Sequence, residues 1–579
     1  MDAFYPVYTQ KNECNDCYKC IRGCHVKAIR ISAGSASVIN EKCIVCGECV
    51  KVCPAKAKTV RSDLDLVKSL ILSGKKVYVS LAPTWKGVYS VSSQAMVKAL
   101  MGLGFAGVSE TALGAQEVSI QTANILNSCE SGLFISSACP VIDNYIRLYK
   151  PDFANSIVPL ASPALTHAAM LKESFGKECE VVFIGPCIAK KTEADAHPNL
   201  ILAALTFEEL NYWLKEEFIE FEPCSDNSYS FLLENSHEGS LYPIEGGMNE
   251  TIRRVGIKNN DVTFIQVSSL ADFDKALQNI DLANVGNKIF VEALSCSGGC
   301  INGPSVASGK SPILITNEIY SKTVNRNLVP TLAKKVVKME YSPKPILNQE
   351  FTIQEISKNL KKIGKHKLED ELNCSACGYT TCREFVNALI QGDAEASQCA
   401  SYMRKIAVRE AAEMLRCMPS SVVIVNSNMQ IVKANDAFER FFLDEETYKA
   451  FSQIDANLEG ASIQKIVPFP ELFKACLERG QKIHHEHYVT KFNGEDKIFD
   501  ISIFSIEENE LVGAVISDVT KSEIDRSKIV QKAKEVISKN ISTVQEIASL
   551  LGEHMVETEL ILESIAQDYG STFSDSKGK

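Results

Sequence analysis

Cysteine is the residue whose number and spacing carry the most chemistry in this sequence. The chain has 21 cysteines, and CNDCYKCIRGC at 14–24 and CIVCGECVKVCP at 43–54 both have the spacing C-x2-C-x2-C-x3-C. In a reducing compartment, clustered cysteines are typical of metal sites rather than disulfides. Three thiolates three residues apart on one loop can bind three corners of a 4Fe–4S cube. We therefore expect one-electron transfer at both stretches.

The two stretches resemble the bacterial ferredoxin run, in which the fourth cysteine of each stretch binds the cluster of the other. This pattern implies one cluster on Cys14, Cys17, Cys20 and Cys53, and a second on Cys43, Cys46, Cys49 and Cys24. His25 follows Cys24 where the run usually has proline. A zinc site more often has two CxxC pairs than two runs of four cysteines, so zinc is the weaker interpretation.

Four further cysteines follow predicted strands in the middle of the chain. The segments 75–84, 132–140, 179–187 and 286–296 are short and apolar, and stretches such as 93–104 and 163–176 between them have helical spacing. The alternation predicts an α/β domain, in which ligands bind beyond the carboxyl ends of the strands. Cys139, Cys187 and Cys296 fall at that end, and Cys300 follows one helical turn later. We expect these four thiolates to meet at one site.

The residues around these cysteines resemble the three signature segments of FeFe-hydrogenases. SSACP at 136–140 is similar to the first, GPCIAKKTE at 185–193 to the second and FVEALSCSGGCING at 290–303 to the third. The resemblance, which covers roughly residues 1–345, implies a 4Fe–4S cubane on Cys139, Cys187, Cys296 and Cys300. It also implies that Cys300 bridges to a di-iron unit with CO, cyanide and azadithiolate ligands.

Other residues take their expected roles from the same resemblance. It implies that Lys190 donates a hydrogen bond to one cyanide, and that the turn of Ala82, Pro83 and Thr84 faces the other. A compact cation with three donors suits a buried diatomic anion. The alternative for Lys190 is a solvated helix lysine beside Lys191.

Several positions depart from the catalytic members of that family. Ala138 stands where a second cysteine relays protons, and alanine has no ionisable group. Gly185 replaces a methionine that covers the di-iron unit, and the helical stretch 113–126 holds a single carboxylate, Glu117, where the family has relay glutamates. INGPSV follows Cys300 in place of a glycine-rich stretch. Loss of positioned acid–base groups typically costs about 10²- to 10⁴-fold in rate, so we expect slow turnover.

A third group of cysteines, at 374–399, has the spacing C-x2-C-x4-C-x16-C. It resembles the small 4Fe–4S domain of corrinoid and carbon-monoxide pathway proteins and of some regulatory proteins. The resemblance implies a further cluster on Cys374, Cys377, Cys382 and Cys399, with zinc as the alternative. The five scattered cysteines are interpreted as small buried apolar side chains: Cys129, Cys179, Cys224, Cys417 and Cys476.

From about residue 409 the cysteine motifs stop. Segments 420–442 and 494–520 are predicted strands and a helix, and their order, with ANDAF at 434–438, resembles a PAS domain, a fold that senses ligands or mediates dimers. His484, His485 and His487 are interpreted as solvated surface, because strand alternation places His484 opposite the other two. The tail 521–569 repeats apolar residues three or four apart, which predicts a coiled-coil or bundle dimer, or a helix packed on the PAS domain.

Length and composition limit the function further. A chain of 579 residues, 45% hydrophobic and 23% charged, is expected to form several globular domains. The net charge of −11 argues against nucleic acid as a partner. The apolar runs are far shorter than the roughly 20 residues that span a bilayer, and the first residues have no signal-peptide apolar stretch. We therefore expect no membrane partner and a cytoplasmic location.

The predicted fold class is multidomain α/β and α+β. We expect a two-cluster ferredoxin-like domain at 1–64, an α/β hydrogenase-type domain at 65–345, a small 4Fe–4S domain at 346–405, a PAS domain at 406–520 and a coiled helical tail at 521–579. This order resembles the sensory FeFe-hydrogenases. The hypothesis is a hydrogen-sensing oxidoreductase of the ferredoxin hydrogenase type, with slow hydrogen oxidation and proton reduction, which passes its redox state to the PAS module.

Two other functions stay open at this point, namely a catalytic ferredoxin-dependent hydrogenase, and an iron–sulfur binding or assembly protein without the di-iron unit. The implied partners are hydrogen and protons, a one-electron carrier such as ferredoxin, and the maturation proteins that build the di-iron unit. No kinase motif follows the PAS segment, so a signalling kinase or phosphatase is expected to act in trans. A homodimer through the PAS domain and tail is also expected.

Overall fold

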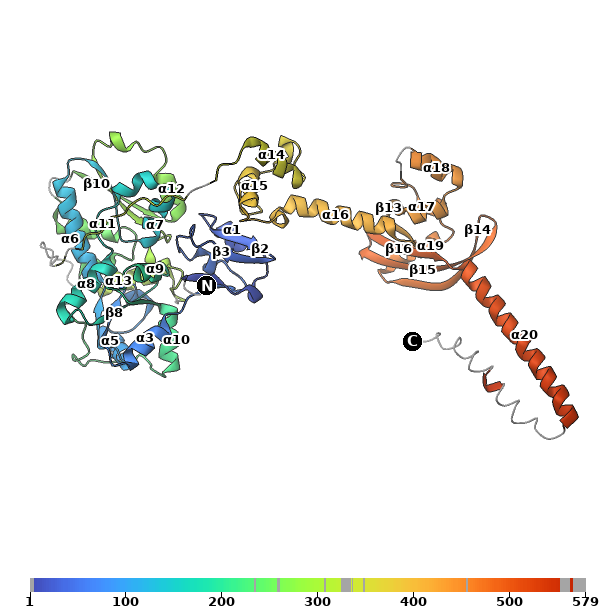
Figure 1. Ribbon diagram of the computed structural model, residues 1–579, viewed down its shortest axis with the longest axis horizontal. Helices are drawn as coiled ribbons and strands as arrows, with labels where there is room; N and C mark the ends of the chain where they lie inside the picture. Colours follow the sequence, from blue (N-terminus) through green and yellow to red (C-terminus); the bar gives the residue numbers. More distant parts are fainter. Residues whose placement is uncertain are drawn as a thin grey trace. The chain divides into compact units, whose positions relative to one another are not determined.

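The computed structural model describes residues 5–233, 236–257, 261–306, 309–323, 335, 337–346, 349–453, 457–551 and 563–565. The chain divides into two compact units, Met1–Met403 and Arg404–Lys579 (Figure 1). Sheets and helices occur in both units.

The first unit begins with two short antiparallel pairs of strands and two one-turn helices. β1 (Val7–Thr9) pairs with β4 (Lys58–Val60), and β2 (Ile29–Ser32) pairs with β3 (Ser35–Val38). The helices α1 (Lys19–Gly23) and α2 (Glu48–Lys51) lie within the two cysteine runs. Gly47 precedes α2 with a φ of +77°, and a Cβ there would lie 2.7 Å from Ile188 and from Pro304. Only glycine therefore allows this loop to pack so closely on the central domain.

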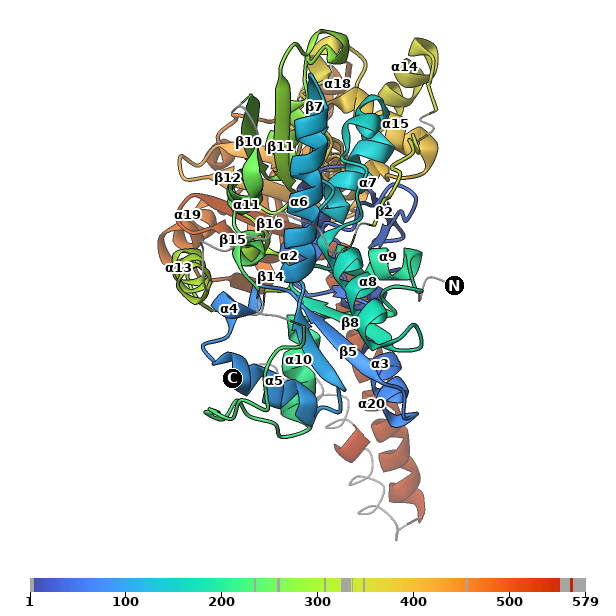
Figure 2. The ribbon, with the colours of Figure 1, turned by 90° about the vertical axis from the view of Figure 1, so that its left-hand side faces the viewer.

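The central domain has two parallel sheets rather than one. The four-stranded sheet has the order β6-β5-β8-β9, and the three-stranded sheet has the order β10-β11-β7. Their bounds are β5 (Val77–Leu81), β6 (Gly107–Glu110), β7 (Gly132–Ile135), β8 (Glu180–Gly185), β9 (Ala203–Thr206), β10 (Val262–Ser268) and β11 (Lys288–Leu294). Figure 2 shows the two sheets one above the other, with the long helix α6 (Ala112–Ser128) alongside.

Helices cover both faces of the four-stranded sheet, which explains why β5 and β8 are almost wholly apolar. On one face pack α3 (Leu64–Leu72), α5 (Ser93–Gly102) and α10 (Phe207–Glu216). On the other face packs α8 (Pro163–Phe175). The remaining helices of the domain are α4 (Trp85–Val88), α7 (Pro140–Tyr149), α9 (Ala189–Ala196), α11 (Gly247–Gly256), α12 (Leu270–Ala276) and α13 (Pro312–Lys322).

The third cysteine group lies on a small helical segment of the first unit. It contains α14 (Ile353–Lys362) and α15 (Cys382–Gln391), and Phe385 and Val386 of α15 are completely buried. These side chains belong to the same hydrophobic core as Ile21 and Ile29 of the amino-terminal region. The long-range packing therefore joins two cysteine regions that are more than 300 residues apart in sequence.

Helix α16 (Ala400–Cys417) directly follows Cys399 and leads to the second unit. That unit contains a five-stranded antiparallel sheet of order β13-β12-β16-β15-β14. Its strands are β12 (Ser421–Asn426), β13 (Ile431–Ala434), β14 (Ile483–Phe492), β15 (Glu495–Glu507) and β16 (Leu511–Asp518), and its helices are α17 (Asp436–Phe442), α18 (Glu445–Gln453) and α19 (Pro470–Arg479). Phe438, Phe469, Phe473 and Phe499 fill the core between sheet and helices.

The final described helix is α20 (Thr520–Leu551). The predicted apolar seam begins on it, and Val530 is 43% exposed. Ala533 is exposed as well, while Ile537 and Ile541 are half-buried. The seam position Met555 lies outside the described residues. The coiled-coil dimer stays a prediction.

Candidate iron–sulfur and hydrogenase-type site

The four cysteines predicted to share one site come from both sheets of the central domain. Cys139 follows β7 and Cys296 follows β11 in the three-stranded sheet, whereas Cys187 follows β8 in the four-stranded sheet. Cys300 is the first residue of a 3-10 turn, Cys300–Asn302. Because all the strands are parallel within their sheets, the loops that carry these cysteines leave from carboxyl-terminal strand ends.

The four sulfurs lie close enough together for the charge of one to shift the pKa of another. Burial raises the pKa of Cys296 well above its usual range, and negative charge on Cys300, Cys187 and Cys139 raises it further. Burial also raises the pKa of Cys300, with Cys139 and Cys187 again contributing. The pKa of Cys139 rises to about 11, through burial and then through Cys187. The structure thus brings together all four predicted thiols.

Four half-buried cysteines grouped in this way fit a cationic iron–sulfur cube. A thiol must lose its proton to bind metal, and the bound iron compensates the negative charge. Among the described residues, no group of three or more His, Cys, Asp or Glu side chains has the spacing of a single bound metal ion. In a four-iron cube each thiolate binds its own iron atom, so the ligands lie farther apart than those of one ion.

The amino-terminal cysteines form two separate groups. Cys14, Cys17, Cys20 and Cys53 line one small cavity of about 20 Å³ beside the buried Lys58. Cys24 lies instead with the second run: burial raises the pKa of Cys46 to about 12, and the charges of Cys24 and Cys43 contribute to that rise. Burial raises the pKa of Cys49 well above its usual range, and the charges of Cys46, Cys43 and Cys24 add to the rise. The fourth cysteine of each run therefore lies with the other run.

In the third group, Cys377 lies near Cys374 and Cys399. Burial raises the pKa of Cys377, and the charges of Cys399 and Cys374 add to the rise. Cys382 is the first residue of α15, where its backbone N–H donates to the Asn373 side chain over 2.8 Å. The helix then returns the chain toward Cys399, as the sequence predicts.

Lys190 is buried, with 8% of its surface exposed. Its Nζ donates to Ser162 Oγ over 2.9 Å and to Glu193 Oε2 over 2.6 Å. Its positive charge partly opposes the rise in the pKa of Cys187 and of Cys300, so it lies near both thiols. Lys191 is completely buried as well, donating to Glu209. The alternative of a solvated helix lysine is wrong, because α9 packs inside the domain.

Gly185 and the 82–84 turn are in direct contact. Ala82, Pro83 and Thr84 follow β5 and are buried, and Gly185 is the last residue of the neighbouring strand β8. A Cβ at Gly185 would lie 2.7 Å from Ala82 Cβ and 2.7 Å from the ring of Phe183. The close approach of these two side chains leaves no room for a larger residue there.

Buried acids near the site were missed by the sequence analysis. Glu292 accepts the backbone N–H groups of Gly246 and Asn249, both over 2.9 Å, yet burial raises its pKa to about 7. Asp143 lies one turn after Cys139, and its Oδ1 is buried without a hydrogen-bond partner among the described residues. Burial raises the pKa of Asp143 well above its usual range. Ala138 itself offers no proton, but the surroundings do contain acids.

The local signals for these acids were weak. Asp143 follows Cys139 at helical spacing and Glu292 precedes Cys296 by four residues, but neither spacing reveals burial. Glu117, the single carboxylate noted on α6, is also buried, and accepts the backbone N–H of Lys335 over 3.0 Å. Burial depends on which elements pack together, so these acids could be recognised only in the folded chain.

Two minor interpretations need correction. Of the five scattered cysteines, Cys179 and Cys476 are buried, but Cys129 and Cys224 are half-buried and Cys417 is exposed at the end of α16. His484, His485 and His487 are exposed as expected, but their side chains do not alternate between the two faces of the sheet as they would in a regular strand. A β-bulge between His485 and Tyr488, with a φ of +57° at His487, interrupts the alternation.

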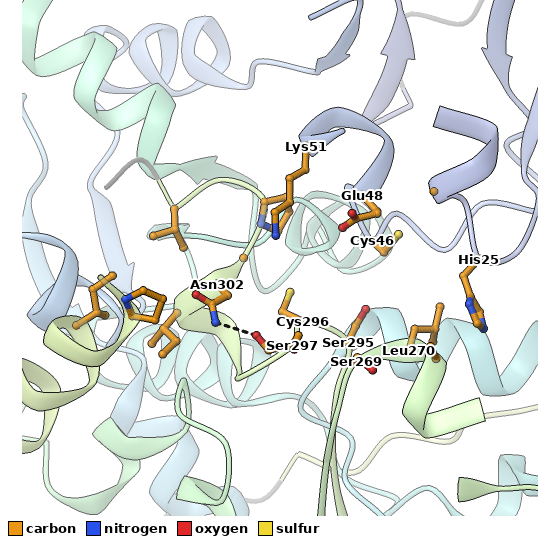
Figure 3. A pocket seen from close by; sticks show the side chains of 18 of the residues that line it. His25, Cys46, Glu48, Lys51, Ser269, Leu270, Ser295, Cys296, Ser297 and Asn302 are labelled. Carbon is orange, nitrogen blue, oxygen red and sulfur yellow. Dashed lines mark hydrogen bonds between the residues drawn. The ribbon is translucent and has the colours of Figure 1, made fainter. Parts of the chain in front are cut away.

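A cavity of about 660 Å³ lies between the amino-terminal region and the central domain. Cys46 and Cys296 line it from opposite walls, with His25, Glu48 and Lys51 on the side of Cys46 (Figure 3). Asn302 donates to the carbonyl of Ser297 over 2.8 Å on the side of Cys296. The charge of Cys46 also contributes to the raised pKa of Cys296. The second amino-terminal cysteine group and the central group are therefore neighbours.

Comparisons with protein families match four regions of the chain. Residues 75–304 match the iron only hydrogenase large subunit, C-terminal domain, and residues 36–59 match a 4Fe-4S binding domain. Residues 370–401 match an Fe-S cluster domain, and residues 419–521 match a PAS domain. The chain is therefore a hydrogenase-like iron–sulfur protein with a PAS domain, and the predicted multidomain fold class is confirmed.

Individual relatives are distant. Iron hydrogenase 1 of Clostridium pasteurianum is 23% identical over 371 residues, which cover 46% of this chain and 64% of the relative. A component of the ion-translocating oxidoreductase complex of Methanosarcina acetivorans is 44% identical over 48 residues, 8% of this chain and 18% of the relative. The solved FeFe-hydrogenase HydA1 from Chlamydomonas reinhardtii is similar with a TM-score of 0.35 at 18% identity, covering 46% of this chain and 89% of that chain. The chain thus spans less than two thirds of the length of the two curated relatives.

Among the described residues, every helix is too short or too polar to cross a bilayer.

Proposed function

We propose that this protein senses hydrogen at an FeFe-hydrogenase-type site and oxidises hydrogen or reduces protons only slowly. The observation that carries the proposal is the meeting of Cys139, Cys187, Cys296 and Cys300 beside buried Lys190, with alanine at position 138. The proposed cofactors are four 4Fe–4S clusters and a di-iron unit with CO, cyanide and azadithiolate. Two clusters belong to the amino-terminal groups, one to the central group and one to the group at 374–399.

When bound, the di-iron unit would supply the binding and cleavage of hydrogen, with Cys300 as its bridge to the protein. The buried ammonium of Lys190 would donate a hydrogen bond to one cyanide, and the turn of Ala82, Pro83 and Thr84 would enclose the other. Ala138 holds no proton at the position where catalytic members have a cysteine. Proton exchange would then lack its nearest side-chain donor, which typically costs about 10²- to 10⁴-fold in rate.

The neighbouring cysteine groups provide a path for the redox change. Cys46 and Cys296 line one cavity, so an electron taken from the central group would reach the second amino-terminal cluster first. From there we propose that it passes to the cluster at 374–399, whose last ligand, Cys399, directly precedes α16. α16 leads to the PAS domain, and the tail follows it. This order connects the hydrogen site to a signalling module along the chain.

The proposed partners follow from the same chemistry. They are hydrogen and protons, a one-electron carrier such as ferredoxin, maturation proteins for the di-iron unit, and a signalling kinase or phosphatase in trans. A homodimer through the PAS domain and tail, and a cytoplasmic location, complete the proposal. A catalytic ferredoxin-dependent hydrogenase is the second candidate, and the buried carboxyl groups of Asp143 and Glu292 favour it, because they could replace the missing relay.

Infrared spectroscopy of the matured full-length protein tests the proposal. We expect the stretching bands of CO and cyanide, their loss in Cys300→Ser, and their retention in the matched control Cys129→Ser, whose cysteine lies outside all four groups. Absence of the bands in the matured wild-type protein would refute the di-iron site and favour a binding or assembly role. Steady-state hydrogen evolution at the rate of a catalytic hydrogenase would instead support the second candidate.

A further inference from the structure

The segment that carries the third cysteine group is held against the amino-terminal region by specific contacts. Asp393, at the end of α15, is 5% exposed and pairs with Arg30 over 2.8 Å and with Lys42 over 2.5 Å. Glu395 accepts the backbone N–H of Ala33 over 2.9 Å. A Cβ at Gly378 would lie 3.0 Å from Ile21. The two regions therefore form a fixed junction.

Two side chains at this junction lie near a cysteine from each region. Burial lowers the pKa of Lys27, and the charges of Cys24 and Cys377 both oppose that change. Tyr379 belongs to one hydrophobic core with Cys24, and Cys377 packs against that core. A Cβ at the neighbouring Gly378 would lie 3.3 Å from the backbone nitrogen of Arg22, two residues before Cys24. Cys24 belongs with the second amino-terminal group and Cys377 with the third. Lys27 and Tyr379 thus lie within electrostatic range of two different cysteine groups.

The hydroxyl of Tyr379 is an independent sign that something is bound here. The residue is 5% exposed, its ring packs 5.7 Å from that of Phe385, and its hydroxyl has no hydrogen-bond partner in the part of the chain that the structure describes. A buried donor without an acceptor is unfavourable, because it has lost its hydrogen bonds to water. Asp393 also lies within electrostatic range, but its two oxygens already accept from Arg30 and Lys42. Sulfur atoms of bound clusters would supply the missing acceptor.

We propose that the Tyr379 hydroxyl donates a hydrogen bond to a cluster sulfur at this junction, and that electrons pass here between the cluster that includes Cys24 and the cluster that includes Cys377. The inference rests on the proposed function and adds the side chains, Tyr379 and Lys27, that would lie at the transfer between these two clusters. One cluster loses one electron as the other gains it, and Tyr379 keeps its proton. The hydroxyl and the Lys27 ammonium both stabilise the more negative, reduced state.

The test is a redox titration of the full-length protein with reconstituted clusters, followed by electron paramagnetic resonance. In Tyr379→Phe we expect one cluster to become harder to reduce, by about tenfold in the one-electron equilibrium, since a hydrogen bond is stronger to the more negative, reduced cluster. Lys27→Gln should make both clusters of the junction harder to reduce. Tyr18→Phe is the matched control, because the Tyr18 hydroxyl already donates to Asp16 over 3.0 Å.

Iron content and hydrogen exchange show whether each variant keeps its clusters and fold. Unchanged midpoints in Tyr379→Phe, at full iron content, would overturn the hydrogen bond. Magnetic coupling of the reduced third cluster should disappear in Cys24→Ser and persist in Cys14→Ser, and the reverse would overturn the electron path. None of these signals needs the di-iron unit. Missing CO and cyanide bands would therefore refute the proposed function while leaving this junction standing.

Discussion

The junction between the amino-terminal region and the third cysteine segment depends on one buried carboxylate. Arg30 donates to Asp393 Oδ1 through Nε over 3.0 Å and through Nη2 over 2.8 Å, and Lys42 donates to Oδ2 over 2.5 Å. Burial would raise the pKa of Asp393, but hydrogen bonds from Lys42 and Arg30 hold it below the ordinary 3.8. Asp393→Asn removes the negative charge and keeps the shape.

The expected loss can be worked out from these contacts. A hydrogen bond to a charged group contributes about 1.5–3 kcal/mol, but the Arg30 side chain is 46% exposed and regains water when the pair breaks. The amide also keeps one acceptor. We therefore expect about 3 kcal/mol, which corresponds to a roughly 100-fold increase in local opening.

Hydrogen exchange measures this opening directly. Amides of α15, and that of Ile31, which donates to the Asp393 carbonyl, should lose about 100-fold of their protection in Asp393→Asn. Glu369→Gln, an exposed acid of the same segment, is the matched control. Because the pKa of Asp393 is lowered, its stabilisation is present above pH 3.8 and is lost as the pH falls through the lowered value. Protection that changes less than about threefold in Asp393→Asn would refute the reasoning.

Four further predictions concern the hydrogenase-type domain and the PAS domain. Gly185→Met should destabilise the domain by about 1–3 kcal/mol through overpacking against Phe183, and thermal unfolding that is unchanged would contradict this. Burial lowers the pKa of His167 to about 3, so the free energy of unfolding of the wild-type protein should fall by about 1.4 kcal/mol per pH unit below about pH 6.5. Urea unfolding at several pH values should show that His167→Gln lacks this pH dependence. Asn435 donates to the carbonyls of Leu415 in α16 and of Met418 and Ser420 just before β12, and Asn435→Ala should cost the PAS domain about 3 kcal/mol, visible as faster hydrogen exchange in β12. Ala138→Cys should raise the rate of hydrogen evolution by about 10²-fold or more in matured protein, and Ala138→Ser is the control. An unchanged rate in the cysteine variant would count against the relay hypothesis.

Several features could be predicted from the sequence because they depend on local spacing. The cysteines of each run lie on one loop, so three of every four ligands are close together whatever the rest of the chain does. The strand ends that carry Cys139, Cys187 and Cys296 were also predictable, since the stretches before them are short, apolar and rich in β-branched and aromatic residues, which favours strands over helices. The PAS domain was recognisable from its strand order and the ANDAF segment, which places Asn435 before α17.

Other features were decided only by tertiary structure. The sequence alternation does not show that the central strands divide into two sheets, or that loops from both sheets bring Cys187 to Cys139 and Cys296. The sequence also does not show which polar groups are buried. Lys190 and Lys191 are buried within the central domain, and burial raises the pKa values of Asp143 and Glu292. Residue type and spacing along the chain determine which groups are available for chemistry. The packing of elements far apart in sequence decides which groups become neighbours and which lose contact with water. The loss of water then shifts the pKa values of those groups and so their charge.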